Sequence, residues 1–238
     1  MSNLLKVGNL SVSFGKDDKE VKAVQNVSFD MKRGETIALV GESGSGKSVT
    51  ALSIMKLLPY PVAWHPQGSI EFDGEELMLA DESQMRAIRG NRVSMIFQEP
   101  LNSLNPLHNV EKQINEVLHL HKNMTPGQAR ARVEELLNLV GMPEAKSRLH
   151  SFPHEFSGGQ QQRIMIAMAL ANEPELLIAD EPTTALDVTI QAQVLKLLKE
   201  LTRKFDMGLL MITHDLGIVQ RMADKVYVMN EGQVVEYN

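Results

Sequence analysis

One glycine-rich stretch constrains this sequence more than any other feature. Residues 41–48 read Gly-Glu-Ser-Gly-Ser-Gly-Lys-Ser, which matches the pattern G-x-x-x-x-G-K-[ST]. The apolar run Thr36–Val40 before it predicts a buried strand, and a helical apolar stretch begins at Val49 and stops at Pro59 and Pro61. The pattern requires this strand–loop–helix context, so a chance match to an ordinary glycine-rich turn is the weaker interpretation.

The residue types of this loop suit phosphate binding. Glycines let the backbone curl until successive N–H groups point at phosphate oxygens, and the following helix directs its positive dipole end at the same anion. Lys47 supplies a point charge to the β- and γ-phosphates, and the Ser48 hydroxyl can ligate Mg²⁺. We therefore expect ATP and Mg²⁺ as ligands. The expected nucleotide-binding residues of the loop are Gly41, Ser43, Gly44, Ser45, Gly46, Lys47, Ser48 and Val49.

A phosphate loop of this kind needs an acidic residue for its metal at the end of a neighbouring strand. The apolar run Leu176–Ala179 leads directly into Asp180, and Glu181 follows. We expect Asp180 to hold Mg²⁺ through its water shell and Glu181 to polarise the attacking water as general base. An acidic pair at a strand end is common by itself and gains its meaning from the glycine-rich loop.

A second glycine pair stands at the start of a predicted long helix, Gln161–Ala171. Residues 157–160 read Ser-Gly-Gly-Gln, in which Ser157 suits the N-cap and the glycines leave N–H groups uncovered for an anion. Alone, such a segment is more often a capped loop than a ligand site.

Composition excludes several classes of protein. The chain has 238 residues, 43% of them apolar, and 24 basic against 30 acidic side chains, which argues against general nucleic-acid binding. The absence of cysteine excludes disulfides, thiolate zinc sites and cysteine catalysis within these residues. The longest apolar run, Ile164–Ala171, is far below the ~20 residues that span a bilayer. The N-terminal residues do not resemble a signal peptide.

The pattern of apolar residues indicates an α/β fold. We expect one domain over residues 1–238, with a β-rich N-terminal layer and a helical part inserted at approximately 86–160. Strands that alternate with helices predict a mostly parallel sheet. The expected strands are Leu5–Phe14, Val24–Asp30, Thr36–Val40, Ser69–Phe72, Leu176–Ala179, Leu209–Ile212 and Val226–Met229.

Over essentially its whole length the sequence resembles the nucleotide-binding subunit of ATP-binding cassette (ABC) transporters. Six motifs of that family occur here in the family's order. They are the loop at 41–48, Gln98 in the Q-loop position, the signature at 157–160, the pair Asp180-Glu181, the D-loop Ala185-Leu186-Asp187 and the switch histidine His214. The resemblance implies a P-loop NTPase (RecA-like) core with an antiparallel β-subdomain and an inserted α-helical subdomain.

The resemblance also implies roles for single residues. Glu181, His214 and Lys47 take the catalytic positions, and Gln98 joins Ser48 and Asp180 around the metal. Phe14 matches the aromatic position that stacks on adenine, although an aromatic residue in a strand more often belongs to a core. The signature residues expected to contact nucleotide are Ser157, Gly158, Gly159 and Gln160.

Three segments narrow the resemblance to the ATPases of oligopeptide, dipeptide and nickel importers. They are residues 94–106, residues 153–156 and residues 179–188. Within that group the likeness is to the N-terminal ATPase half of microcin C-type peptide importers. Members usually continue beyond a strand like Gln233–Glu236, so we expect the chain to be a truncated protein or one half of a tandem protein.

The resemblance implies an ATPase that drives import of peptides or a peptide-like or nickel solute from the cytoplasmic face of the bacterial inner membrane. Its implied partners are integral membrane permease subunits, a second ATPase domain that sandwiches ATP, identical or different, and indirectly a periplasmic solute-binding protein. Two alternatives stay open. An ABC ATPase acting on nucleic acid or ribosomes usually carries zinc cysteines, long coiled coils or a basic linker, and this chain has none. A regulatory half that barely hydrolyses ATP tends to lose residues such as Lys47 and Glu181.

Overall fold

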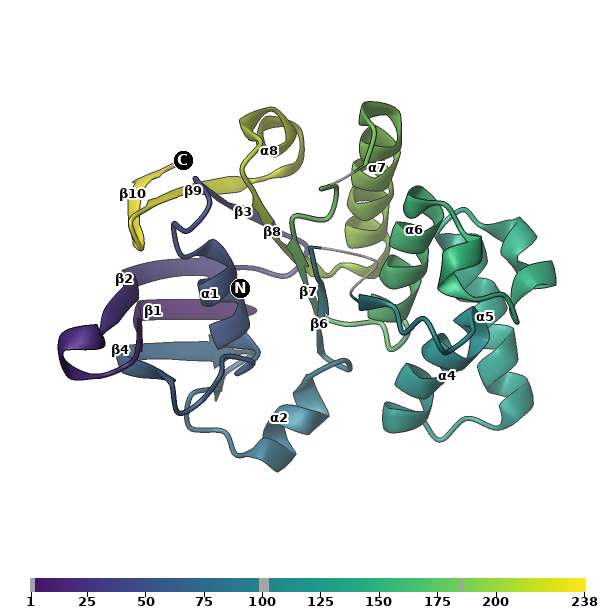
Figure 1. Ribbon diagram of the computed structural model, residues 1–238, viewed down its shortest axis with the longest axis horizontal. Coiled ribbons are helices and arrows are strands. Elements are labelled where there is room, and N and C mark those ends of the chain that lie inside the picture. Colours follow the sequence, from purple (N-terminus) through teal and green to yellow (C-terminus); the bar gives the residue numbers. More distant parts are fainter. Residues whose placement is uncertain (1–2, 99–102, 185) are drawn as a thin grey trace. The chain divides into compact units, whose positions relative to one another are not determined.

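The computed structural model describes residues 3–98, 103–184 and 186–238, and the chain divides into two compact units (Figure 1). Unit one comprises Met1–Arg86 and Asp206–Asn238, and unit two comprises Ala87–Phe205. The α/β class expected from the sequence is confirmed, since both units combine strands with helices. The boundaries expected for one domain with an inserted helical part stay a prediction.

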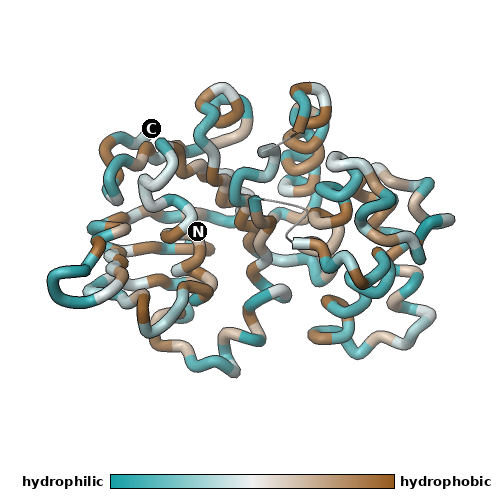
Figure 2. The backbone as a smooth tube through the Cα atoms, viewed as in Figure 1, coloured by the Kyte–Doolittle hydropathy of each residue, from teal (hydrophilic) through white to brown (hydrophobic). Residues whose placement is uncertain are grey.

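Unit one contains a four-stranded antiparallel sheet. Strand β1 (Leu5–Phe14) lies between β2 (Val21–Met31) and β4 (Ala63–Phe72), and the short β5 (Glu75–Glu76) pairs with β4. Most apolar residues of these strands are buried, and burial alternates over residues 27–31 of β2, although four consecutive residues of β1 are buried and Val21 is exposed. The expected hairpin after Phe72 is present, although β4 begins earlier than expected. A hydrophilic turn with a 3₁₀ helix, Asp17–Lys19, joins β1 to β2 (Figure 2).

The second sheet of unit one is mostly parallel. Strand β3 (Thr36–Val40) pairs in parallel with β8 (Gly208–Thr213) and β9 (Lys225–Asn230), and β10 (Gln233–Tyr237) pairs antiparallel with β9. All residues of β3 and β8 are buried, as expected for strands covered on both faces. The three expected parallel strands are therefore confirmed.

The sheets of unit one are joined by an ion-pair cluster around Lys225 of β9. Its ammonium lies 3.3 Å from a carboxylate oxygen of Asp30 on β2 and 3.2 Å from one of Glu35. Burial alone lowers the pKa of Lys225, but hydrogen bonds to Glu35 and Asp30 outweigh it and hold that pKa above its ordinary value.

Helix α1 (Lys47–Ile54) is shorter than expected and begins sooner. It starts two residues before Val49 and ends well before Pro59, so the expected end was wrong. The chain turns at Lys56, whose backbone is left-handed with φ 47°. The Lys56 ammonium donates hydrogen bonds to the carbonyls of Met78 and Ala80, at 3.0 and 2.8 Å, which favours the turn over a longer helix. The other helices that begin in unit one are α2 (Glu82–Ile88) and α8 (Leu216–Met222).

Unit two contains two parallel strands and most of the helices. Strand β6 (Val93–Ile96) pairs with β7 (Leu176–Asp180). The helices of the described part are α4 (Val110–His121), α5 (Pro126–Leu139), α6 (Gly158–Ala169) and α7 (Val188–Phe205), with 3₁₀ turns at Pro143–Arg148 and Pro153–Glu155. The apolar face expected around Val133 is buried, and α5 ends before Gly141, which has φ 73°.

Strand β6 corrects the sequence interpretation. The segment that begins near residue 86 was expected to be helical, yet Val93–Ile96 is a strand whose residues pair in register with Leu176–Ala179. Four residues are too few for a periodicity to show, so the sequence contains no clear signal for this strand. Among the residues that the structure describes, no helix is both long and apolar enough to cross a membrane.

Candidate nucleotide-binding site

The glycine-rich loop leaves the end of β3 in a conformation that depends on two of its glycines. Gly41 has φ 154°, and a Cβ atom there would lie 2.1 Å from the carbonyl oxygen of Met229. Gly46 has φ 97°, and a Cβ atom would lie 2.6 Å from the carbonyl oxygen of Ala23. Both neighbours are backbone atoms, which cannot move aside, so the loop packs closely against β2 and the end of β9.

The Lys47 side chain folds back onto the inside of this loop. Its ammonium donates hydrogen bonds to the carbonyls of Gly41 and Glu42 at 2.8 and 2.7 Å, and to Ser45 Oγ at 3.4 Å. Helix α1 begins here after Gly46, which is left-handed and offers no side chain to cap the first N–H groups. A fixed cation and an uncapped helix start therefore share one loop, and that combination suits an anion with several oxygens.

His214 leaves the same sheet edge as the loop. In the parallel pair of β3 and β8, Val40 lies opposite Thr213, so Gly41 and His214 follow paired positions. Asp215 fixes the turn, since its backbone N–H donates to Thr213 Oγ1 at 3.1 Å and its carboxylate accepts from the start of α8. The His214 side chain is exposed.

The other predicted residues of unit one surround this edge in sequence. Ser43 and Gly44 are exposed at the loop tip, while Ser48 and Val49 are half-buried in the first turn of α1. Phe14 is half-buried at the end of β1, opposite Val21 of β2.

Unit two brings Gln98 and the acidic pair together. Ile96 of β6 lies opposite Ala179 of β7, so the chain segments that follow leave the same edge. Asp180 is buried at 7% exposure, and Glu181 accepts a hydrogen bond from the Gln98 amide at 3.1 Å. This contact joins two predicted residues that lie far apart in the sequence.

Thr184, which the sequence interpretation did not include, also contacts Glu181. Its hydroxyl donates to Glu181 Oε2 at 2.7 Å, and its backbone N–H donates to the Glu181 carbonyl at 3.1 Å. Glu181 has a left-handed backbone with φ 45°. The available signal was a hydroxyl residue three positions after an acid at a strand end, the spacing of a tight turn.

The signature segment 157–160 forms the start of α6. The Ser157 hydroxyl accepts from the Gln160 N–H at 3.4 Å, and the Gln160 side chain accepts from the Ser157 N–H at 3.0 Å, which completes a capping box. The expected N-cap is confirmed. A Cβ atom at Gly159 would lie 2.7 Å from Ile190 Cγ2 on α7, whereas one at Gly158 would lie 3.9 Å from Leu186 Cδ2. The packing of α6 against α7 therefore favours glycine at position 159, whether or not an anion binds there.

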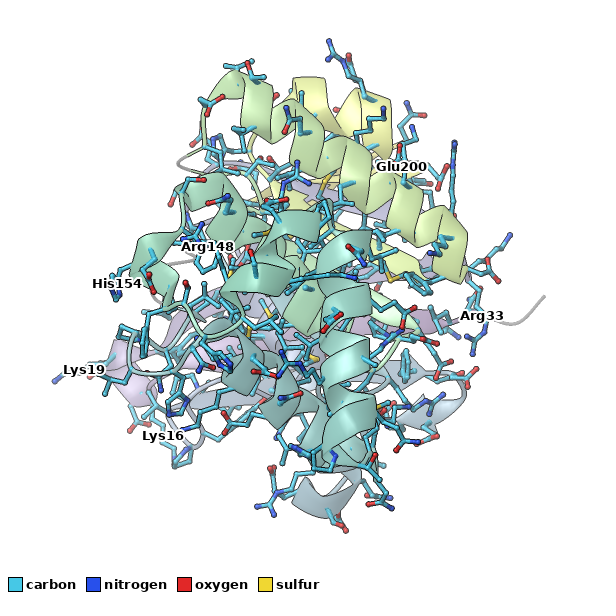
Figure 3. All side chains as sticks on the ribbon, turned by 90° about the vertical axis from the view of Figure 1, so that its right-hand side faces the viewer. Lys16, Lys19, Arg33, Arg148, His154 and Glu200 are labelled. Atoms are coloured by element: carbon cyan, nitrogen blue, oxygen red, sulfur yellow. The ribbon has the colours of Figure 1, made fainter. Side chains whose placement is uncertain are left out.

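The segment before Ser157 is held by Arg148. Its guanidinium donates to the carbonyl of Glu155 at 2.7 Å and lies 4.3 Å from the ring centroid of Phe156. His154 projects from the edge of the ribbon into solvent (Figure 3). Of the predicted D-loop, Ala185 lies outside the described residues, and Asp187 accepts from the N–H groups of Thr189 and Ile190 at the start of α7.

A cavity of about 750 Å³ lies elsewhere on unit two, beside α4. None of the predicted site residues lines it. Its lining includes His108, His119 and His150. In the part of the chain that the structure describes, no cluster of three or more histidine, aspartate or glutamate side chains is arranged to hold a metal ion.

Comparison with known proteins identifies the family. The family model described as ABC transporter matches residues 24–184. The chain belongs to the ABC transporter family. ATP-binding domains of this family bind nucleotide and hydrolyse ATP to power transport. The matched residues include the loop at 41–48.

Two relatives of this ABC cassette are named for the transport of peptidoglycan and of oligopeptides. It is 60% identical to "Peptidoglycan transport ATP-binding protein YejF" of Agrobacterium fabrum, over 98% of this chain and 43% of that protein. It is 53% identical to "Oligopeptide transport ATP-binding protein OppD" of Bacillus subtilis, over 99% of this chain and 66% of that protein. The chain thus spans between two fifths and two thirds of the length of these relatives.

Solved structures share the fold of this ABC cassette. The ATP-binding cassette MJ0796, solved as a dimer in a post-hydrolysis state with ADP and Pi, superposes with a TM-score of 0.86 at 28% identity, over 98% of this chain and 97% of that one. CbiO1 of Clostridium perfringens, part of the ABC transporter complex cbiONQ, gives 0.84 at 28% identity, over 100% and 89%. The P-loop NTPase fold expected for this chain is therefore confirmed.

Proposed function

We propose that this ABC cassette is the ATP-hydrolysing motor of an importer for peptides or peptide-like solutes. The observation that carries the proposal is the close-packed loop at 41–48, in which Lys47 and an uncapped helix start face inward together. The name of the relative at 53% identity, an oligopeptide transport protein, supports the peptide class of solute, and the peptidoglycan transport protein at 60% identity supports a peptide-like one.

ATP is held in this proposal by residues of several motifs. Backbone N–H groups of the loop and the Lys47 ammonium bind the β- and γ-phosphates, and Phe14 stacks on adenine. His214 contacts the γ-phosphate from the sheet edge that it shares with the loop. The signature residues 157–160 contact the ATP of a second ATPase domain, as the family resemblance implies, and the solved cassette MJ0796 is likewise a dimer.

Magnesium fits the chemistry of the proposed donor set. Ser48 offers a hydroxyl, Asp180 a buried carboxylate and Gln98 an amide, all of them oxygen ligands of the type that Mg²⁺ prefers. When bound, the ion neutralises charge that develops on the phosphate oxygens. Glu181 accepts the proton of the attacking water in this scheme, and Gln98 reports the state of the site because it contacts Glu181 directly.

The proposal places the chain at the cytoplasmic face of a bacterial inner membrane, bound to integral membrane permease subunits. These subunits and a periplasmic solute-binding protein select the solute, while this chain supplies the energy. The second ATPase domain is a copy of this chain or the other half of a tandem protein.

Nucleotide binding by Lys47 tests the proposal. Lys47→Ala should weaken ATP binding at least about 10-fold, because it removes the cation nearest the phosphates. Lys196→Ala is the matched control, since Lys196 is an exposed lysine on α7 whose ammonium lies 3.8 Å from a carboxylate oxygen of the exposed Glu200. Fluorescent ATP titration measures both. Equal affinities of wild type and Lys47→Ala would contradict the proposed binding of phosphates by this loop and Lys47.

The solute class requires a separate measurement. Bacteria whose only copy of the full-length protein carries Lys47→Ala should lose uptake of a labelled tripeptide. Bacteria whose only copy carries the control substitution Lys196→Ala should keep it. Unchanged uptake with Lys47→Ala would reject the importer function, while the assignment of the loop as an ATP-binding site would stand.

A further inference from the structure

Two consecutive threonines follow the acidic pair, and their hydroxyls have different partners. Thr183 is buried, and its Oγ1 accepts a hydrogen bond from the Gln191 amide of α7 at 3.1 Å. Thr184 is half-buried, and its Oγ1 donates to Glu181 Oε2 at 2.7 Å. Thr183 therefore anchors the turn to α7, whereas Thr184 directs its hydroxyl at the carboxylate.

The length and the partners of the Thr184 contact are those of a strong hydrogen bond. Hydroxyl-to-carboxylate bonds of about 2.5–2.7 Å are typical of an ionised acceptor. The same residue also closes the turn through its backbone N–H, which donates to the Glu181 carbonyl at 3.1 Å. One residue thus fixes both the backbone and the side chain of Glu181.

The backbone of Glu181 gives this contact a purpose. A φ of 45° is uncommon for a residue with a side chain, so the conformation persists only where its surroundings hold it. That conformation sets the direction in which the side chain leaves the end of β7. The Gln98 amide reaches the same oxygen, Oε2, from the end of β6 at 3.1 Å. Donors from two segments restrict rotation of the carboxylate.

We propose that Thr184 is a positioning residue for Glu181. The Thr184 hydroxyl holds the Glu181 carboxylate in the direction needed to accept the proton of the attacking water. This rests on the proposed function, because it takes Glu181 as the general base. A base must lie within hydrogen-bond reach of the proton it removes, and a displacement of about 1 Å can cost about 100-fold in rate. Removing the hydroxyl should therefore slow the chemical step and leave nucleotide binding largely unchanged.

The test compares variants of Thr184 that differ in the hydroxyl. Thr184→Val keeps the shape of the side chain and should lower kcat about 10-fold in the full-length protein at saturating ATP. The KM for ATP and the Kd for ATP should stay within about twofold of wild type. Thr184→Ser restores the hydroxyl and should recover kcat to within about threefold. Thermal unfolding of each variant shows whether the fold is intact.

A structural role would give a different pattern. Wild-type kcat in Thr184→Val, or an equal loss in Thr184→Ser, would overturn the proposal, as would a loss confined to ATP affinity. If valine lowers Tm by more than a few degrees, Thr184→Ala against Thr184→Ser makes the same comparison, because these two differ only in the hydroxyl.

Glu181→Gln separates this proposal from the proposed function. If Glu181→Gln keeps wild-type turnover, the general base is another group and both assignments fall. If Glu181→Gln abolishes turnover while Thr184→Val does not alter it, the base assignment stands and only the positioning role of Thr184 falls. We expect turnover to be lost in Glu181→Gln, lowered in Thr184→Val and recovered in Thr184→Ser.

Discussion

Gly41 and Gly44 stand in the same loop but under different constraints. At Gly41 an added Cβ would meet the Met229 carbonyl oxygen at 2.1 Å, while at Gly44 no atom lies within 4 Å. Both have positive φ, at 154° and 82°, so an alanine is strained at either position. The difference between them isolates the effect of close backbone packing.

Alanine substitutions at these two glycines should therefore differ in stability. Gly44→Ala should cost about 1 kcal/mol, the usual strain of a left-handed residue with a side chain. Gly41→Ala should cost at least about 3 kcal/mol, because β9 and the loop must also move apart. Urea unfolding measures both values. Equal losses would show that the Met229 carbonyl yields easily and that the packing does not hold the loop.

The residue scale also shows what a motif leaves out. The glycine-rich pattern supplied the loop residues, and the acidic pair that follows Leu176–Ala179 supplied Glu181. The sequence did not single out Thr184: its spacing from Glu181 suits a tight turn, but the side-chain contact also depends on the left-handed backbone of Glu181. Nor did it explain Gly159, whose lack of a side chain is required by Ile190 on α7.

At the scale of elements, long or strongly patterned segments were predictable. Strands β1 and β3 have the expected bounds, because alternation in one and a short apolar run in the other are bounded by turn residues. Strand β6 escaped prediction since four residues carry no period and its partner β7 lies some eighty positions away. The end of α1 was misplaced because contacts of the Lys56 side chain, rather than Pro59, turn the chain.

The contact between α6 and α7 makes a prediction about the signature glycines. Gly158→Ala should be neutral or slightly stabilising, because the nearest atom would lie 3.9 Å away and alanine favours the helix. Gly159→Ala should destabilise by about 1–3 kcal/mol through overpacking against Ile190. Thermal and urea unfolding test this pair.

The double substitution Gly159→Ala with Ile190→Ala provides the control for that prediction. Removing Cγ2 of Ile190 takes away the atom that a Cβ at Gly159 would meet at 2.7 Å, so the two changes should not be additive. Additive losses would mean that Gly159 is needed for another reason, such as the approach of a ligand to its N–H group.

At the scale of the whole molecule, the chain contains two motifs that the proposed function assigns to different ATP molecules. The loop at 41–48 belongs to unit one, and the signature 157–160 belongs to unit two. If each ATP contacts the loop of one copy and the signature of another, ATP must favour association by mass action. Loss of the γ-phosphate must reverse it, since ADP lacks the group that both copies would contact.

Size-exclusion chromatography of the Glu181→Gln variant tests this linkage, because blocked hydrolysis should preserve the ATP-bound form. Saturating Mg²⁺ and ATP should shift its elution from monomer to dimer, while ADP should not. Adding Ser157→Arg should abolish the shift but leave ATP affinity within about twofold. The bulky arginine side chain would then stand where the phosphates of the ATP bound to the second copy must approach. Ser147→Arg is the matched control, because it puts the same side chain at an exposed position of the 3₁₀ turn in unit two. A Ser157→Arg variant that dimerises with ATP as fully as Ser147→Arg would show that the signature does not contribute to a shared site.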